Sequence, residues 1–205
     1  METGRLEKLL PLAGVVFGIL LAVGLVVGGA PSDTTDSKEQ IFKHYDGDAG
    51  KLFVAFICLG IGAVVFMFFA IGLRAFLRAT GPESAGTLVF AACVVFTVGM
   101  GRVIETQFGL LNAASDKNLD VLPALNYIDN GNFAVPVIGL CVFYLGMAWH
   151  IITTGSLPKW LGWVSLVLGI GVLAGPIGIV ALFLLAPYTV VLGVLLRNRG
   201  VPAAV

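Results

Sequence analysis

The stretch Leu52–Leu73, LFVAFICLGIGAVVFMFFAIGL, decides the fold class, because it holds no charged residue between Lys51 and Arg74. About 20 apolar residues are what an α-helix needs to cross the hydrocarbon core of a bilayer. In lipid every backbone amide must be bonded within the segment, and the stretch lacks the two-residue alternation of a barrel strand. The sequence therefore predicts a transmembrane helix here.

Further apolar runs of similar length extend this interpretation to the whole chain. The predicted spans are 9–30, 52–73, 85–111, 133–153, 157–175 and 177–196. Spans of about 20 residues take up well over half of the chain, so we expect a single all-α transmembrane domain, a six-helix bundle over residues 1–205. A short uncharged turn at Gly175-Pro176 joins the last two predicted spans, which should form an antiparallel hairpin.

The composition also indicates a membrane protein. Hydrophobic residues make up 58% of the chain and charged residues 12%, whereas soluble domains carry about 25% charged residues. The net charge of zero gives no basic field for nucleic-acid binding, so the expected surroundings are a lipid bilayer. Cys58, Cys93 and Cys141 lie inside apolar runs and are interpreted as core residues rather than disulfide partners.

The N-terminal run Leu9–Ala30 is longer than the 7 to 15 residues typical of a signal peptide, which favours a retained first helix over a cleaved signal. The distribution of Lys and Arg near the span ends then predicts the orientation. With the N-terminus inside, the inner segments hold Arg5, Lys8, Arg74, Arg78, Lys159, Arg197 and Arg199, and the outer ones hold Lys38, Lys43, Lys51 and Lys117. We expect a multi-pass protein of the inner (plasma) membrane with both termini cytoplasmic.

Two outer segments have the pattern of short surface helices. The outer loop 31–51 contains Asp36–Tyr45, which begins with the cap-type residue Asp36. The second segment, Leu119–Ile128, starts at Asp120 or Pro123 and is stopped by Asn130-Gly131. For both segments a surface helix and an irregular loop remain open.

Glycines recur at a spacing of four residues, which places both members of a pair on one helix face and lets a neighbouring backbone approach closely. The pairs are Gly14/Gly18, Gly24/Gly28 and Gly171/Gly175. Packing within one bundle is the favoured interpretation, and a dimerisation seam or a pore lining is the alternative.

Charged side chains inside a bilayer cost a few kcal/mol each, so they mark structural pairs or functional sites. Arg102 and Glu105 lie three residues apart in the third span, share a helix face and can pair. The polar residues before the fourth span lie on the same side of the membrane and reach this pair if their segment dips into the bundle. The candidate cluster is Arg102, Glu105, Gln107, Asp129, Asn130 and Asn132.

Two interpretations of this cluster stay open. In the structural one, Arg102 and Glu105 form a local salt bridge while Asp129 or Asn132 caps the fourth span. In the functional one, a cation and two carboxylates form a polar pocket that suits a proton-coupled step or the binding of a small polar ligand.

No catalytic, metal or cofactor motif is found. His44 and His150 are expected on opposite sides of the membrane, so they cannot jointly bind zinc or haem, and His150 is interpreted as an interfacial residue. Asp46-Gly47-Asp48 opens like a calcium loop, but its twelfth position would be Ile57 instead of Glu. We therefore expect no cofactor.

Two short motifs resemble those of a known group of proteins. They are Gly101-Arg102-Val103-Ile104-Glu105 and Leu157-Pro158-Lys159-Trp160-Leu161. The stretch from about 88 to 175 resembles an uncharacterised bacterial group of six-span integral membrane proteins. In that group an Arg-x-x-Glu ends the third span and a Leu-Pro-basic-Trp-Leu opens the fifth. The resemblance implies a bacterial origin and six spans, and it implies no particular activity.

Three classes of function remain. The favoured class is a non-enzymatic membrane component for assembly, sensing or ligand binding, working with a membrane-protein partner or as a homo-oligomer. The second is a small proton-coupled transporter or channel that uses the polar cluster. The third is an intramembrane enzyme acting on lipid, with Glu105 or Asp129 as acid or base.

Overall fold

The computed structural model describes residues 3–174 and 176–199, and these residues form α-helices with no strand. The all-α prediction is therefore confirmed. The helices are α1 (Thr3–Gly28), α2 (Lys38–Gly47), α3 (Ala49–Thr80), α4 (Glu83–Ser115), α5 (Leu122–Gly131), α6 (Ala134–Thr154), α7 (Lys159–Val172) and α8 (Pro176–Arg199).

Five helical segments of the described residues are long and apolar enough to cross a membrane. They are Leu9–Gly28, Ala49–Thr80, Glu83–Ser115, Leu122–Thr154 and Val180–Arg199. The remaining apolar helix, α7, has 14 residues, or about 21 Å at 1.5 Å per residue, and is shorter than a bilayer core of about 30 Å. Gly175, part of the predicted turn and of the Gly171/Gly175 pair, lies outside the described residues.

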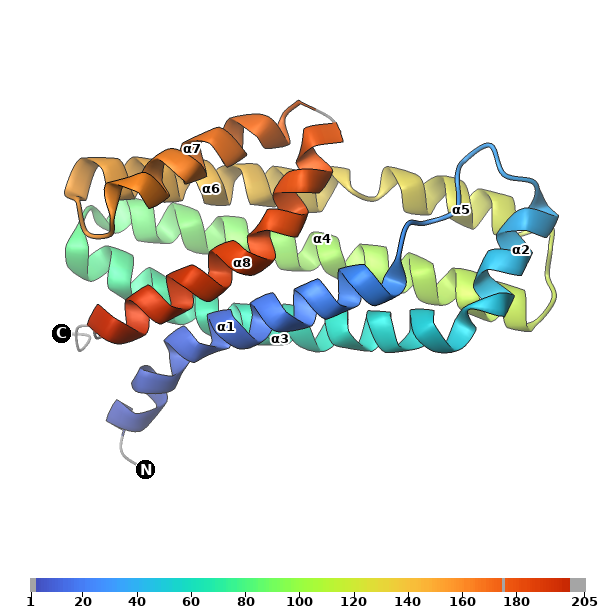
Figure 1. The fold of residues 1–205 in the computed structure, drawn as a ribbon, viewed down its shortest axis with the longest axis horizontal. Coiled ribbons are helices and arrows are strands. Elements are labelled where there is room, and N and C mark those ends of the chain that lie inside the picture. Colours follow the sequence, from blue (N-terminus) through green and yellow to red (C-terminus); the bar gives the residue numbers. More distant parts are fainter. Residues whose placement is uncertain (1–2, 175, 200–205) are drawn as a thin grey trace.

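Helices α3, α4 and α6 run side by side along the molecule, and α7 follows α6 (Figure 1). Helix α8 crosses in front of this layer, from the end of α7 to α1, and packs along α1. The start of α1 and the end of α8 lie at one end of the bundle, which we call the terminal end. Helices α2 and α5 lie at the opposite end.

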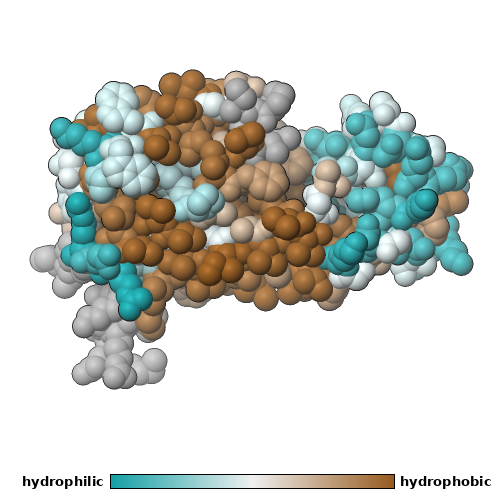
Figure 2. Space-filling model, in the orientation of Figure 1, coloured by the Kyte–Doolittle hydropathy of each residue, from teal (hydrophilic) through white to brown (hydrophobic). Residues whose placement is uncertain are grey.

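Apolar side chains cover the surface of the bundle, and hydrophilic residues gather over α2 and α5 (Figure 2). Several large apolar side chains are mostly exposed, including Val26 at 75%, Val167 at 69% and Leu173 at 70%. A soluble protein rarely exposes so much contiguous apolar surface. A lipid environment accounts for this surface, so the fold is that of a helical membrane protein.

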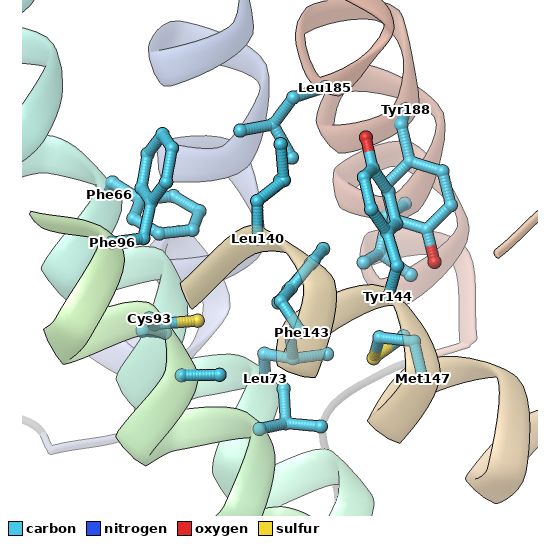
Figure 3. Packing of buried hydrophobic residues seen from close by; sticks show 14 of the residues in the cluster. Phe66, Leu73, Cys93, Phe96, Leu140, Phe143, Tyr144, Met147, Leu185 and Tyr188 are labelled. Carbon is cyan, nitrogen blue, oxygen red and sulfur yellow. The ribbon is translucent and has the colours of Figure 1, made fainter. Parts of the chain in front are cut away.

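Aromatic side chains fill the middle of the bundle. Phe66 lies at its centre, with its ring centroid 4.4 Å from that of Phe17 and 5.4 Å from that of Phe96. Phe143 continues the cluster towards Tyr144 and Tyr188 (Figure 3). All of these side chains are buried, so the centre of the bundle is filled by packed rings.

Buried hydroxyl groups tie α8 to its neighbours. The Tyr144 hydroxyl donates to the Ala181 carbonyl oxygen at 3.1 Å, and the hydroxyls of Ser165 and Tyr188 lie 2.8 Å apart. Each polar group thus has a partner inside the apolar region, where an unpaired group would be costly. These bonds hold α8 in its oblique course across the bundle.

The glycine pairs of α1 serve packing within the bundle. A Cβ atom at Gly18 would lie 2.5 Å from the Ala186 carbonyl oxygen of α8, and one at Gly24 would lie 2.6 Å from the Leu59 side chain of α3. Side chains larger than hydrogen at these positions would therefore push the helices apart.

Both predicted surface segments are helices, with corrected boundaries. Helix α2 begins after Ser37, not at Asp36, because Ser37 and Gln40 form a reciprocal capping box. Helix α5 begins at Leu122 with Pro123 in its first turn, where a missing N–H costs little.

One of the close helix contacts, between α4 and α6, offers a test of the packing. A Cβ atom at Gly139 of α6 would lie 2.5 Å from the backbone nitrogen of Phe96 in α4. We expect Gly139→Ala to lower the free energy of unfolding by about 1–3 kcal/mol, as overpacking does, in thermal unfolding of the detergent-solubilised protein. Gly60→Ala is the matched control, because a Cβ there meets nothing within 4 Å. Equal loss of stability in both variants would contradict the packing.

Candidate functional site

The length of α3 and α4 creates a small folded cap beyond the bundle. These helices have 32 and 33 residues, about 50 Å each, against about 30 Å of hydrocarbon. The cap consists of α2, α5, the loops 29–37 and 116–121, the first turns of α3 and the last turns of α4. It has its own buried core, made of Ile41, Tyr45, Leu52, Ala55, Phe56, Leu110, Ala113, Ala114 and Leu122.

Two asparagines of α5 hold the loop that follows α1. The Asn126 side-chain amide donates to the Asp33 carbonyl oxygen at 2.8 Å, and that of Asn130 donates to the Ser32 carbonyl oxygen at 3.0 Å. Asn130 also donates to the Asn126 carbonyl oxygen one turn earlier. These bonds fix the loop against α5, so Asn130 has a structural role.

Asp129 is buried completely between these asparagines and the bundle. Neither of its carboxyl oxygens has a hydrogen-bond partner among the described residues, and the same holds for Gln107 Oε1 and Asn126 Oδ1. The Gln107 side chain lies beside the carboxyl group without a hydrogen bond of regular geometry. Four buried acceptor atoms of these three side chains thus lack a hydrogen bond of regular geometry, although buried polar groups are nearly always paired.

Tyr45 of α2 faces the same region from the cap. Its side chain is almost completely buried, and burial raises the pKa of Tyr45, with a further contribution from the negative charge of Asp129. The hydroxyl group therefore keeps its proton over the physiological range and is available as a donor.

A cavity of about 70 Å³ opens between the cap and the bundle. It has room for a few water molecules or a small ion. Its polar lining includes His44, Tyr45 and Gln107. The rest of the wall is Gly24, Leu25, Gly28, Gly29, Pro31, Leu52, Phe56, Leu59, Val103 and Phe133.

Arg102 and Glu105 lie on the other side of α4, and the predicted salt bridge between them is wrong. Both side chains are exposed, and they form no ion pair within the part of the chain that the structure describes. Val103, in contrast, is buried and lines the cavity with Gln107. Positions 103 and 107 share the inward face of α4, which turns 102 and 105 outward, so Arg102 does not reach Asp129.

The predicted capping of the fourth span is also wrong. Phe133 is the N-cap of α6, and no side chain bonds to the first turn. Asn132 instead donates to Thr106 Oγ1 at 2.6 Å, and Thr106 donates to the Arg102 carbonyl oxygen. Asn132 therefore joins α4 to the break between α5 and α6.

His150, interpreted from the sequence as interfacial, is buried at the terminal end. Its Nε2 lies 3.0 Å from Thr80 Oγ1, and its ring packs so closely on Gly81 that a Cβ there would lie 2.6 Å from it. It joins α6 to the end of α3.

The predicted cluster thus divides into an inward group, Gln107 with Asp129, and an outward group, Arg102 with Glu105. Sequence reasoning missed Tyr45 and Asn126 as members of the inward group. Tyr45 follows the apolar pattern of α2, which marks a buried face without showing what it faces. Among the described residues no three His, Cys, Asp or Glu side chains form a metal site.

No protein-family model, no curated protein and no solved structure matches the chain.

The bonds of Asn130 lead to a test of the cap. We expect Asn130→Ala to release the loop around Ser32, because each lost hydrogen bond costs about 1 kcal/mol. Amide hydrogen exchange should become faster by about tenfold or less across residues 30–36, with α3 and α4 unchanged. The control is Tyr127→Ala, whose side chain is 74% exposed. Unchanged exchange in the Asn130 variant would show that the loop is held by other contacts.

Proposed function

We propose that the protein is a six-span component of a bacterial inner membrane that senses or binds a small, positively charged ligand in the cavity lined by Tyr45 and Gln107. Both of these residues neighbour the buried carboxyl group of Asp129, which does not itself line the cavity. The observation that carries this proposal is the group of four buried acceptor atoms without donors on Gln107, Asn126 and Asp129.

The six-span topology is supported by the position of the chain ends. Both ends of the described chain lie at the terminal end (Figure 1), which requires an even number of crossings. The five long spans together with α7 satisfy that condition, and a short helix can cross where the bilayer thins. The terminal end carries Arg74, Arg78, Lys159, Arg197 and Arg199, and by the positive-inside rule these residues support a cytoplasmic position for this end and both termini.

The chemistry of the cavity favours a cation or a protonated amine. Carboxylate and amide oxygens accept hydrogen bonds and coordinate cations, whereas an anion would meet repulsion from Asp129. An ion pair with Asp129 would also offset the cost of burying its charge. The Tyr45 hydroxyl and the Gln107 amide then limit the size of what enters.

The packed centre of the bundle favours binding over transport. Phe17, Phe66 and Phe96 are buried in mutual contact on the terminal side of the cavity (Figure 3 shows two of them). A transporter would have to separate these rings in every cycle. A lipid-acting enzyme with Glu105 or Asp129 as acid or base is the third hypothesis. Asp129 of α5 is completely buried, away from a lipid substrate, whereas Glu105 is exposed on the outward face of α4.

Thermal unfolding of the purified protein tests ligand binding. Chlorides of sodium, potassium, ammonium and methylammonium are compared at constant ionic strength. A ligand at 100 times its Kd stabilises by about 2.7 kcal/mol, so we expect at least one of these cations to raise Tm by several degrees. Asp129→Asn should abolish the rise, and Glu105→Gln, on the outward face, should keep it.

The same series contains the outcomes that contradict the proposal. If none of the four salts raises the wild-type Tm above its value in the chloride of a cation too bulky for the cavity, such as N-methylglucamine, at the same ionic strength, the cavity does not bind these cations. If Asp129→Asn responds as strongly as the wild type, the cation binds elsewhere.

A further inference from the structure

Arg102 and Glu105 project from the face of α4 that is turned away from the core. The buried residues of α4 include Phe96, Met100 and Val103, and at 100° per residue Glu105 points almost directly opposite to them. Both charged side chains are exposed and have no ion-pair partner among residues 3–174 and 176–199. The bundle therefore presents one positive and one negative charge side by side on its outer surface.

These charges lie within the apolar belt, as the neighbouring helix α3 shows. Phe108, one turn beyond Glu105, has its ring 5.5 Å from that of Phe56 and 6.0 Å from that of Phe53. At that level Phe53 and Val54 are 53% and 50% exposed. The apolar surface of α3 thus continues at least one turn past Glu105.

Helix α5, on the other side of α4, also shows that the apolar surface extends beyond Glu105. Asn132 bonds to Thr106 of α4, and Ile128, one turn further into the cap, is still 46% exposed. Glu105 is therefore flanked on both sides by apolar surface that reaches beyond it. A charge at this depth that faces lipid costs several kcal/mol unless it is paired.

We infer that this face of α4 is the interface of a two-fold homodimer, in which Arg102 of each copy pairs with Glu105 of the other. A two-fold axis parallel to the bundle sets two α4 helices side by side in the same direction. Position 102 of one copy then lies about 4.5 Å in height from position 105 of its partner, a step that an arginine side chain spans. The symmetry forms the pair twice, so the surface is complementary to itself.

The shape of the same face permits this contact. Thr87, Ala91, Val98 and Gly101 lie along it with Glu105, and all are exposed. A Cβ at Gly101 meets nothing within 4 Å inside the chain. Small residues beside a polar pair let two helices approach closely in a membrane, and here the charge complementarity selects a second copy as the occupant.

Charge reversal on separate copies distinguishes pairing between chains from pairing within one chain. Arg102→Glu and Glu105→Arg are produced with different affinity tags and reconstituted in lipid vesicles, singly and mixed. Each variant alone carries two like charges at the interface, and we expect its apparent dimer dissociation constant to rise at least about tenfold. In the mixture both pairs are restored across the interface, so one tag should co-purify the other variant at wild-type yield.

A steric variant keeps the inference testable if the charge variants fold poorly. Gly101→Leu fills space that is empty in the single chain, so we expect it to keep the wild-type Tm of the monomer and to lose the dimer. Gly60→Leu on α3, where a Cβ also meets nothing within 4 Å, is the matched control and should remain dimeric.

Three results would overturn the inference. They are a wild-type protein that is monomeric in vesicles at high protein-to-lipid ratio, a mixture of the charge variants that does not associate, and a Gly101→Leu variant that dimerises as well as Gly60→Leu. The salt series with Asp129→Asn is independent of these results, because Asp129 lies on the inward side.

Discussion

The excess length of α3 and α4 over the thickness of a bilayer is the constraint on which the rest of the structure depends. With 32 and 33 residues, these helices extend about 20 Å beyond about 30 Å of hydrocarbon. Lys51 and Arg74 bound the apolar stretch of α3, so the excess length is divided between the two ends of the bundle. At the cap end, α2 and α5 cover the last turns of α4 and the first turn of α3. The cap, its separate core and the cavity beneath it all follow from that mismatch.

Helix α4 has two different polar faces at the level where the cap meets the bundle. Its inward face carries Gln107 beside the buried carboxyl group of Asp129, and its outward face carries Arg102 and Glu105. Because a helix separates side chains by 100° per residue, Glu105 and Gln107, two positions apart, point to different surroundings. The inward face borders a cavity and the outward face belongs to the apolar surface of the bundle, so the proposed ligand binding and the proposed association with a second copy would use separate residues of one helix.

The helices could be predicted from the sequence, but the side-chain contacts of the candidate site could not. Apolar runs such as Leu52–Leu73 predict helices because lipid admits only helices and closed barrels, and these runs lack the alternation of barrel strands. Five of the predicted spans lie within helices except for one or two terminal residues, whereas 157–175 extends beyond both ends of α7 (Lys159–Val172). The pairing of Arg102 with Glu105 failed because spacing shows which side chains share a face and not what that face meets. The bonds of Asn126 and Asn130 to the backbone at 32–33 join segments more than ninety residues apart, and no local pattern encodes them.

The proposed function requires that the cavity at the cap end opens outside the cell and that the terminal end lies inside. Labelling of single cysteines with a membrane-impermeant maleimide in intact cells measures this directly, with the wild-type protein as background. His44→Cys, at the cavity lining, should react without permeabilisation, and Arg78→Cys, at the terminal end, should react only after it. Labelling of Arg78→Cys in intact cells, with His44→Cys protected until permeabilisation, would contradict this orientation.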